Sequence, residues 1–117
     1  MKKSLEEVAR EDGRYSPGAL KFVYDGLGYT VRNVVGEARH ITGQTLCEGL
    51  RKLALEKYGR LALLVLNTWG VKHTRDFGEI VYLMINNQWM NAQPTDSIDD
   101  FNNVFDLKTT LKDQFEF

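Results

Sequence analysis

The sequence predicts a mainly α-helical fold: a compact bundle of five or six helices with at most a small two-stranded element near the C-terminus. Apolar residues recur at intervals of three and four through much of the first 86 residues. The segment Thr74-Arg75-Asp76-Phe77-Gly78-Glu79-Ile80-Val81 has the residue types of a helix start. Strand-compatible sequence follows only after residue 87. A winged-helix-like core is one arrangement that fits this order of elements.

Length and composition indicate a single domain over residues 1–117, with 43% hydrophobic and 26% charged residues. One cysteine excludes an internal disulfide and fits a reducing compartment. The N-terminus turns acidic before any apolar run, so we expect no signal peptide. The longest apolar run, residues 61–66, is too short to cross a bilayer. We therefore expect a cytoplasmic protein without a membrane association.

The net charge of −1 is the sum of two unequal halves. Residues 1–60 carry 11 Lys/Arg and 8 Asp/Glu, a balance of +3, and residues 61–117 carry 4 and 8, a balance of −4. Proteins that bind nucleic acid usually present a basic face to the phosphates. Only the first half could offer one, and weakly.

Two helices are expected in the first 36 residues. Ser4–Asp12 forms a short one that Gly13 stops, so residues 1–13 are a peripheral N-terminal helix. Ser16-Pro17 begins the second, because proline fits the first helical position. Its apolar stripe comprises Leu20, Val23, Tyr24, Leu27 and Val31, and we expect it to end near Val35-Gly36. Gly26 and Gly28 would permit close approach of a partner backbone, as in a helix-mediated dimer.

The middle of the chain predicts two more helices. Thr42 caps the first of them, and Gly59 ends it. Its core face comprises Leu46, Leu50, Leu53 and Ala54. The second, Arg60 to Trp69, is so apolar that we expect it to be the central helix, buried nearly all round.

The fifth helix begins at Thr74 as N-cap, with Asp76 and Glu79 where the helix dipole favours negative charge. Its core residues are Phe77, Ile80, Val81 and Met84. After it, the run Gln88–Ala92 is strand-compatible and is expected to pair with Val104-Phe105. Between them Ser97–Phe101 forms one helical turn, and Asp106 caps a closing segment, Leu107 to Phe117.

Several blocks of sequence stand together in order: Arg39-His40-Ile41-Thr42-Gly43-Gln44, Leu66-Asn67-Thr68-Trp69-Gly70, the helix start at Thr74–Val81, Asp96-Ser97, Asp100-Phe101 and Phe105-Asp106. With them the chain, from about Tyr15 to the C-terminus, resembles a family of short bacterial proteins of unknown function that is largely restricted to the planctomycete and verrucomicrobial lineages. The resemblance implies a bacterial origin and carries no catalytic assignment.

Two positions depart from the pattern of that family. Thr45 stands where the family has the glutamate of a capping box, so the helix start at Thr42 keeps half of this device. Arg75 stands where the family is typically acidic, and a cation in the first turn opposes the helix dipole. Both changes make this side more basic, which favours an anionic partner.

The strongest candidate site in the sequence is a basic pair beside a helix start. Arg39 and His40 precede Thr42, Gly43 and Gln44, whose free amides could join them in holding a phosphate or carboxylate. The alternative is structural: Arg39 pairs with an acidic side chain, and His40 bonds a backbone carbonyl to fix the connector.

Other residues invite weaker hypotheses. Cys47 near His40 could form a nucleophile–base pair, although its apolar stripe is typical of core packing. Asp76 and Glu79 with His73 could be drawn as a metal site, yet the pattern is typical of capping charges, and we expect no metal. Trp89 and Arg75 are candidates for partner contact, with hydrophobic closure as the alternative for Trp89.

Three functions are compatible with these residues. The first is a non-catalytic protein-interaction or adaptor domain without a cofactor, because no converging catalytic set is visible and the charge split suits docking to another protein. The second is a winged-helix-like nucleic-acid-binding protein, against which the acidic residues of the predicted recognition helix argue. The third is a small enzyme or anion-ligand sensor that uses Arg39 and His40.

Overall fold

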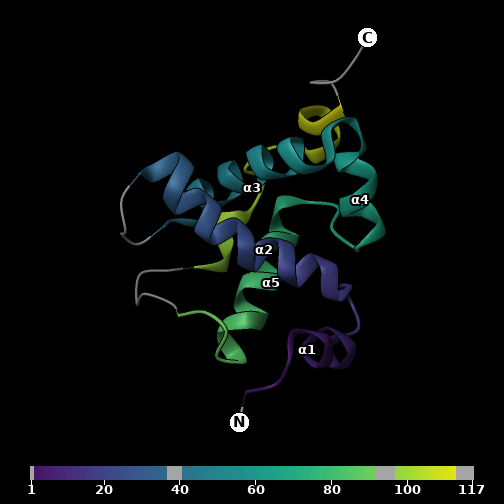
Figure 1. Cartoon of the computed structure of the whole chain (residues 1–117), viewed down its shortest axis with the longest axis vertical. Helices are drawn as coiled ribbons and strands as arrows, with labels where there is room; N and C mark the ends of the chain where they lie inside the picture. The colour runs from purple at the N-terminus through teal and green to yellow at the C-terminus, as the bar shows by residue number, and fades with distance from the viewer. Residues whose placement is uncertain (1, 37–40, 92–96, 113–117) are drawn as a thin grey trace.

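The computed structural model describes residues 2–36, 41–91 and 97–112, which are mainly helical (Figure 1). The α-helices in these residues are α1 (Leu5–Asp12), α2 (Pro17–Thr30), α3 (Gly43–Tyr58), α4 (Ala62–Thr68) and α5 (Thr74–Asn86). Short 3₁₀ or π turns complete them: η1 (Val31–Val35), η2 (Gly59–Leu61), η3 (Ile98–Phe101) and η4 (Lys108–Lys112). None of the helices described is long and apolar enough to cross a bilayer.

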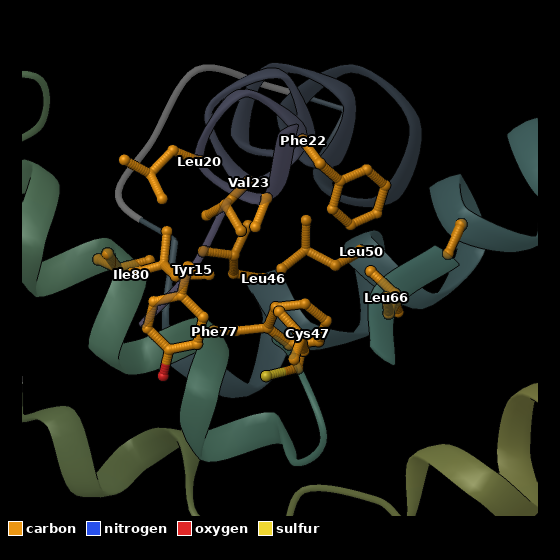
Figure 2. Close-up of a cluster of buried hydrophobic side chains, with 14 of the residues drawn as sticks. Tyr15, Leu20, Phe22, Val23, Leu46, Cys47, Leu50, Leu66, Phe77 and Ile80 are labelled. Atoms are coloured by element: carbon orange, nitrogen blue, oxygen red, sulfur yellow. The ribbon is translucent and has the colours of Figure 1, made fainter. Parts of the chain in front are cut away.

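The core lies where α2, α3 and α5 meet (Figure 2). Figure 2 shows Leu20 and Val23 of α2 above Leu46 and Leu50 of α3, with Phe77 and Ile80 of α5 closing the same cluster. The buried members are apolar, from alanines to Phe77, so apolar burial is the main source of stability. The helical spacing of three and four predicts these core residues of α3 and α5, and the structure confirms them.

Glycines let α2 and α3 approach closely. A Cβ at Gly26 would overlap the side chain of Leu50, and a Cβ at Gly49 would overlap that of Thr30. The hydroxyl of Thr30 is fully buried and donates to the carbonyl of Gly26, 2.7 Å away, so its burial leaves no unpaired donor. The close neighbour of Gly26 is thus α3 of the same chain, whereas Gly28 faces the end of the Arg32 side chain.

Cap residues set the ends of the first three helices where the sequence predicts them. The Ser4 and Thr42 side chains accept from backbone amides in the first turns of α1 and α3. The turn η1 prolongs α2 as a π-helix until Gly36, whose φ of 82° is a left-handed conformation that favours glycine. Gly13 and Gly59 also have positive φ at helix ends. Val8 and Ala9 are buried, and α1 packs against α2, so the peripheral position expected for residues 1–13 stays a prediction.

The expectation that residues 60–69 form the buried central helix is wrong. A 3₁₀ turn precedes α4, which packs against α3 and η4 through one face. Ala62 and Leu66, four residues apart, are buried, while Leu61 and Leu64 are 54% and 62% exposed. A helix of seven residues has neighbours on one side only, so high apolar content does not bury its other face. The central position belongs to α3.

The predicted N-cap of α5 is shifted by one residue. His73 is the N-cap, and Asp76 at the third helical position accepts from the backbone amide of His73, 3.0 Å away. Thr74 is instead the first helical residue, and its side chain is buried. Its hydroxyl therefore bonds to another part of the chain rather than to its own helix.

The two-stranded element expected near the C-terminus is absent from residues 88–91 and 97–112. Gln88 to Met90 form a turn and bend, with Gln88 at φ 65°, and Val104-Phe105 form a bend. The amide of Trp89 donates to the carbonyl of Met84 in α5, so it bonds to the helix end rather than to a strand. The structure gives no support to a winged-helix arrangement. The helical turn predicted at Ser97–Phe101 is confirmed as η3.

The closing segment is confirmed only in part. The carboxylate of Asp106 accepts from the amide and hydroxyl of Thr109, at 3.0 and 2.6 Å, and so caps the following turn. Leu107 and Leu111 are buried as their spacing of four predicts. The rest of the predicted helix, residues 113–117, lies outside the described residues.

We expect Gly49→Ala to destabilise the fold by about 1–3 kcal/mol, because the added methyl group would overlap Thr30 in a closely packed contact. Chemical denaturation followed by circular dichroism measures this change as a lower midpoint.

The matched control for this experiment is Gly28→Ala. Its Cβ would lie 3.1 Å from the terminal guanidinium nitrogen of Arg32, a flexible side chain that can move away. Alanine is also favoured over glycine within a helix by up to about 1 kcal/mol. Equal destabilisation by both substitutions would show that the α2–α3 contact tolerates an extra methyl group.

Candidate functional site

A pocket of about 200 Å³ opens beside the start of α3, where the end of α2, the end of α5 and η3 come together. Its apolar lining comprises Leu27, Val31, Ile41, Leu46, Val81, Ile85, Met90 and Phe101. Four polar residues also line it, namely Tyr82, Asn91, Ser97 and Asp100. A concave and largely apolar surface with a few polar groups is the usual form of a binding site.

Phe101 forms one wall of the pocket because two glycines make room for it. A Cβ at Gly43 would lie 2.9 Å from Cε1 of its ring, and a Cβ at Gly78 would lie 2.8 Å from Cδ1 of the same ring. Real Cβ atoms do not approach so closely, so the ring occupies a notch between α3 and α5. The position of η3 follows from this notch.

The side chain of Thr74 in α5 forms hydrogen bonds to the segment that carries Phe101. Its hydroxyl donates to the carbonyl of Phe101, 2.7 Å away, and accepts from the amide of Val104 at 3.1 Å. Both bonds satisfy backbone groups that η3 cannot pair internally. The buried threonine thereby holds Phe101, the last residue of η3, and Val104, which follows the turn.

Ion pairs of α5 also hold η3, in addition to the glycine notch and the Thr74 hydrogen bonds. Arg75 donates to Glu79 at 3.0 Å, to Asp99 at 2.8 Å and to the amide oxygen of Asn102 at 2.9 Å. Arg14 reaches the other oxygen of Glu79 at 2.9 Å. Hydrogen bonds from Arg14 and Arg75 hold the pKa of Glu79 below its usual range. The guanidinium that was a candidate for partner contact is therefore occupied within the chain.

Asp76 joins the start of α5 to the loop before α2. One carboxylate oxygen accepts from the hydroxyl of Tyr15 at 2.6 Å, and the other accepts from the amides of Lys72 and His73. Burial and the bond to Asp76 raise the pKa of Tyr15 above its ordinary value. Both oxygens of Asp76 thus have hydrogen-bond partners within the chain. In the described part of the chain, no group of three His, Cys, Asp or Glu side chains could hold a metal ion.

The predicted anion site is placed only in part. Arg39 and His40 lie outside the described residues. Thr42 is exposed and caps α3, Gly43 is buried against Phe101, and Gln44 is exposed. Asp100 packs against Gly43, where a Cβ would lie 3.0 Å from its own Cβ. Anion binding at this helix start stays a prediction.

Trp89 is half-buried and closes the N-terminal segment onto the domain. Its indole N–H donates to the carbonyl of Lys3 at 2.8 Å, and the ammonium of Lys2 lies 3.7 Å above its ring. Tyr24 meets the ring edge-on with centroids 5.5 Å apart. These contacts agree with hydrophobic closure, and partner contact by Trp89 stays a prediction.

Cys47 lies in the core with no exposed surface, as its apolar stripe indicates. Burial, reinforced by the nearby charge of Glu48, raises the pKa of its thiol to about 12. The reactive thiolate is therefore scarce at neutral pH, which argues against a cysteine nucleophile.

The pocket itself is missed by sequence reasoning. Its lining comes from five separate segments, and the blocks of sequence that contribute to it do not indicate that they meet. One signal was present: Leu27 and Val31 extend the apolar stripe of α2 beyond the residues that the core fully buries. Asp100, the acidic residue of the described lining, belongs to the block Asp100-Phe101, but nothing in that block indicates that it lines a pocket.

Comparison with known protein families, with curated proteins and with solved structures returned no match to this chain. The resemblance to a family of planctomycete and verrucomicrobial proteins therefore stays a prediction.

Native Cys47 should not react with a thiol reagent such as Ellman's reagent at pH 8, because its raised pKa and burial deny the reagent a thiolate. One thiol per chain should appear when guanidinium unfolds the protein. Rapid stoichiometric labelling of the folded chain would restore the cysteine hypothesis.

We expect Glu79→Gln to destabilise the fold by about 1 kcal/mol at pH 7, because it removes the charge that two guanidinium groups share. Since the folded-state pKa of Glu79 is lowered, its contribution is present above its unfolded pKa of about 4.3. That contribution disappears as the pH falls through the folded-state value. The difference between the two proteins should therefore shrink below about pH 4, as urea denaturation at several pH values would measure.

The control is Glu11→Gln, which removes an exposed pair with Lys3 and should change the stability little at any pH. A loss of the same size in both variants would mean that the network at Glu79 has no special role.

Proposed function

We propose that this chain is a non-catalytic binding domain that recognises another protein by accepting an apolar side chain in the pocket beside α3. The pocket and its apolar lining carry the proposal. Burying one large apolar side chain there would contribute about 1.5–3 kcal/mol. Further contacts around the mouth would be needed for a stable complex, since association itself has a substantial entropic cost.

Other observations favour binding over catalysis. The thiol of Cys47 is inaccessible, and the oxygens of Asp76 and Glu79 have partners within the chain. The pocket brings one carboxylate, one amide and two hydroxyl side chains to apolar walls, and this set lacks the nucleophile–base pair that acyl or phosphoryl transfer uses.

The nucleic-acid alternative has less support. Arg75, the cation in the first turn of the would-be recognition helix, is occupied by Glu79 and Asp99. Asp76 and Glu79 place negative charge at the same helix start. We place the proposed activity in the bacterial cytoplasm, on the grounds of the single cysteine and the family resemblance.

Selection of a display library of random 12-residue peptides against the full chain tests the proposal. We expect binders that carry a large apolar residue, with affinity weakened at least tenfold by Val31→Trp, because the indole would fill the pocket. Ile85→Trp fills it from α5 and should have the same effect. Titration of labelled peptide by fluorescence anisotropy measures the affinity, and circular dichroism checks that each variant is folded.

Leu64→Trp is the matched control, because the same indole is then placed on the exposed face of α4. Affinity should be unchanged there. Binders that are insensitive to both pocket-filling variants would overturn the proposed role of the pocket, as would the recovery of no binders. Strongly salt-dependent binding of a random DNA duplex by the full chain would favour the nucleic-acid alternative.

A further inference from the structure

We infer that the partner segment carries a lysine or arginine beside its apolar anchor, and that this cation pairs with Asp100 at the pocket. The inference rests on the proposed function and names the chemistry of the partner. Two observations support it: no hydrogen bond or ion pair from the described residues reaches the carboxylate of Asp100, and the described lining has no basic side chain.

Asp100 differs from the acidic residues around it. The carboxylate of Asp99 pairs with Arg75, and that of Asp106 bonds to Thr109. Within the described ranges, no hydrogen bond or ion pair reaches the carboxylate of Asp100, although the residue is half-buried. A partly desolvated charge without a counter-ion is the group that gains most from an incoming cation.

The polar groups near Asp100 suit the same kind of ligand. Asn91 and Ser97 line the pocket and can accept hydrogen bonds, and the Ser97 hydroxyl already accepts from the amide of Asp99. The described lining residues include no lysine, arginine or histidine. The described lining therefore carries a negative charge, which complements a positively charged group on the partner.

Asp100 also has a structural role that the test must separate from binding. It packs against Gly43 at the start of α3, where the helix dipole favours a carboxylate. Asp100→Asn keeps the shape and removes the charge. Any loss of stability can be measured on the free protein, and the affinity is then compared only among folded variants.

The experiment uses a selected peptide and a copy in which its basic residue is replaced by glutamine. We expect Asp100→Asn to weaken the lysine or arginine peptide about fivefold at 50 mM salt and to leave the glutamine peptide unchanged. The effect should fall at 500 mM salt, because mobile ions screen a pair at the protein surface. Asp99→Asn removes the same charge one residue away and should weaken the peptide less.

Selected peptides that lack basic residues, or equal affinity for Asp100→Asn and the unmodified chain, would overturn the inference. The proposed function would survive either result as long as Val31→Trp still abolishes binding. Enrichment of acidic peptides would also overturn it. If the pocket-filling variants do not weaken binding, the proposed function is wrong, and the inference about Asp100 falls with it.

Discussion

The arrangement of the C-terminal half depends on the seating of Phe101 in the notch between Gly43 and Gly78. These residues are 35 apart along the chain, and the ring belongs to a third segment, so one aromatic side chain joins three elements. The hydrogen bonds of the Thr74 hydroxyl to the backbone of Phe101 and Val104 hold the segment that carries this ring against α5. The ion pairs of Arg75 fix η3 on its outer side. Without this seat, η3 would have little to hold it, because a single 3₁₀ turn is not stable alone.

The α2–α3 interface uses glycine in the same way. Each glycine within a helix costs about 1 kcal/mol relative to alanine, so Gly26 and Gly49 weaken their own helices. In return the helices approach closely enough for Leu50 and Thr30 to occupy the space that Cβ atoms would take. The gain lies in packing and in the buried bond from Thr30 to the carbonyl of Gly26. The glycines of this chain therefore belong to the packing of its helices as much as to their ends.

The difference between local interactions and contacts between distant segments explains what could be predicted from the sequence. Helix ends depend on residues within a few positions, and so Ser4, Thr42 and Gly36 mark them correctly. Burial of α4 depends on how many neighbours surround it, which the apolar run at residues 61–66 does not encode. The cap of α5 was misplaced because Thr74 bonds to Phe101, a residue 27 positions away. The pocket could not be predicted for the same reason: it forms between segments far apart in the sequence, where the start of α3 meets η3.

The contrast between tight and open packing bears on the function of the pocket. Around Phe101 the packing is so close that two positions, Gly43 and Gly78, have no room even for the methyl group of an alanine. Immediately beside this seat it leaves about 200 Å³ unfilled, lined by side chains of which several are only half-buried. A larger side chain at Val31 could fill this space and would add apolar burial. A concave, largely apolar surface with a few polar groups is the usual form of a binding site. We therefore propose that this space, beside a carboxylate that has no partner among the described residues, receives an occupant from outside the chain.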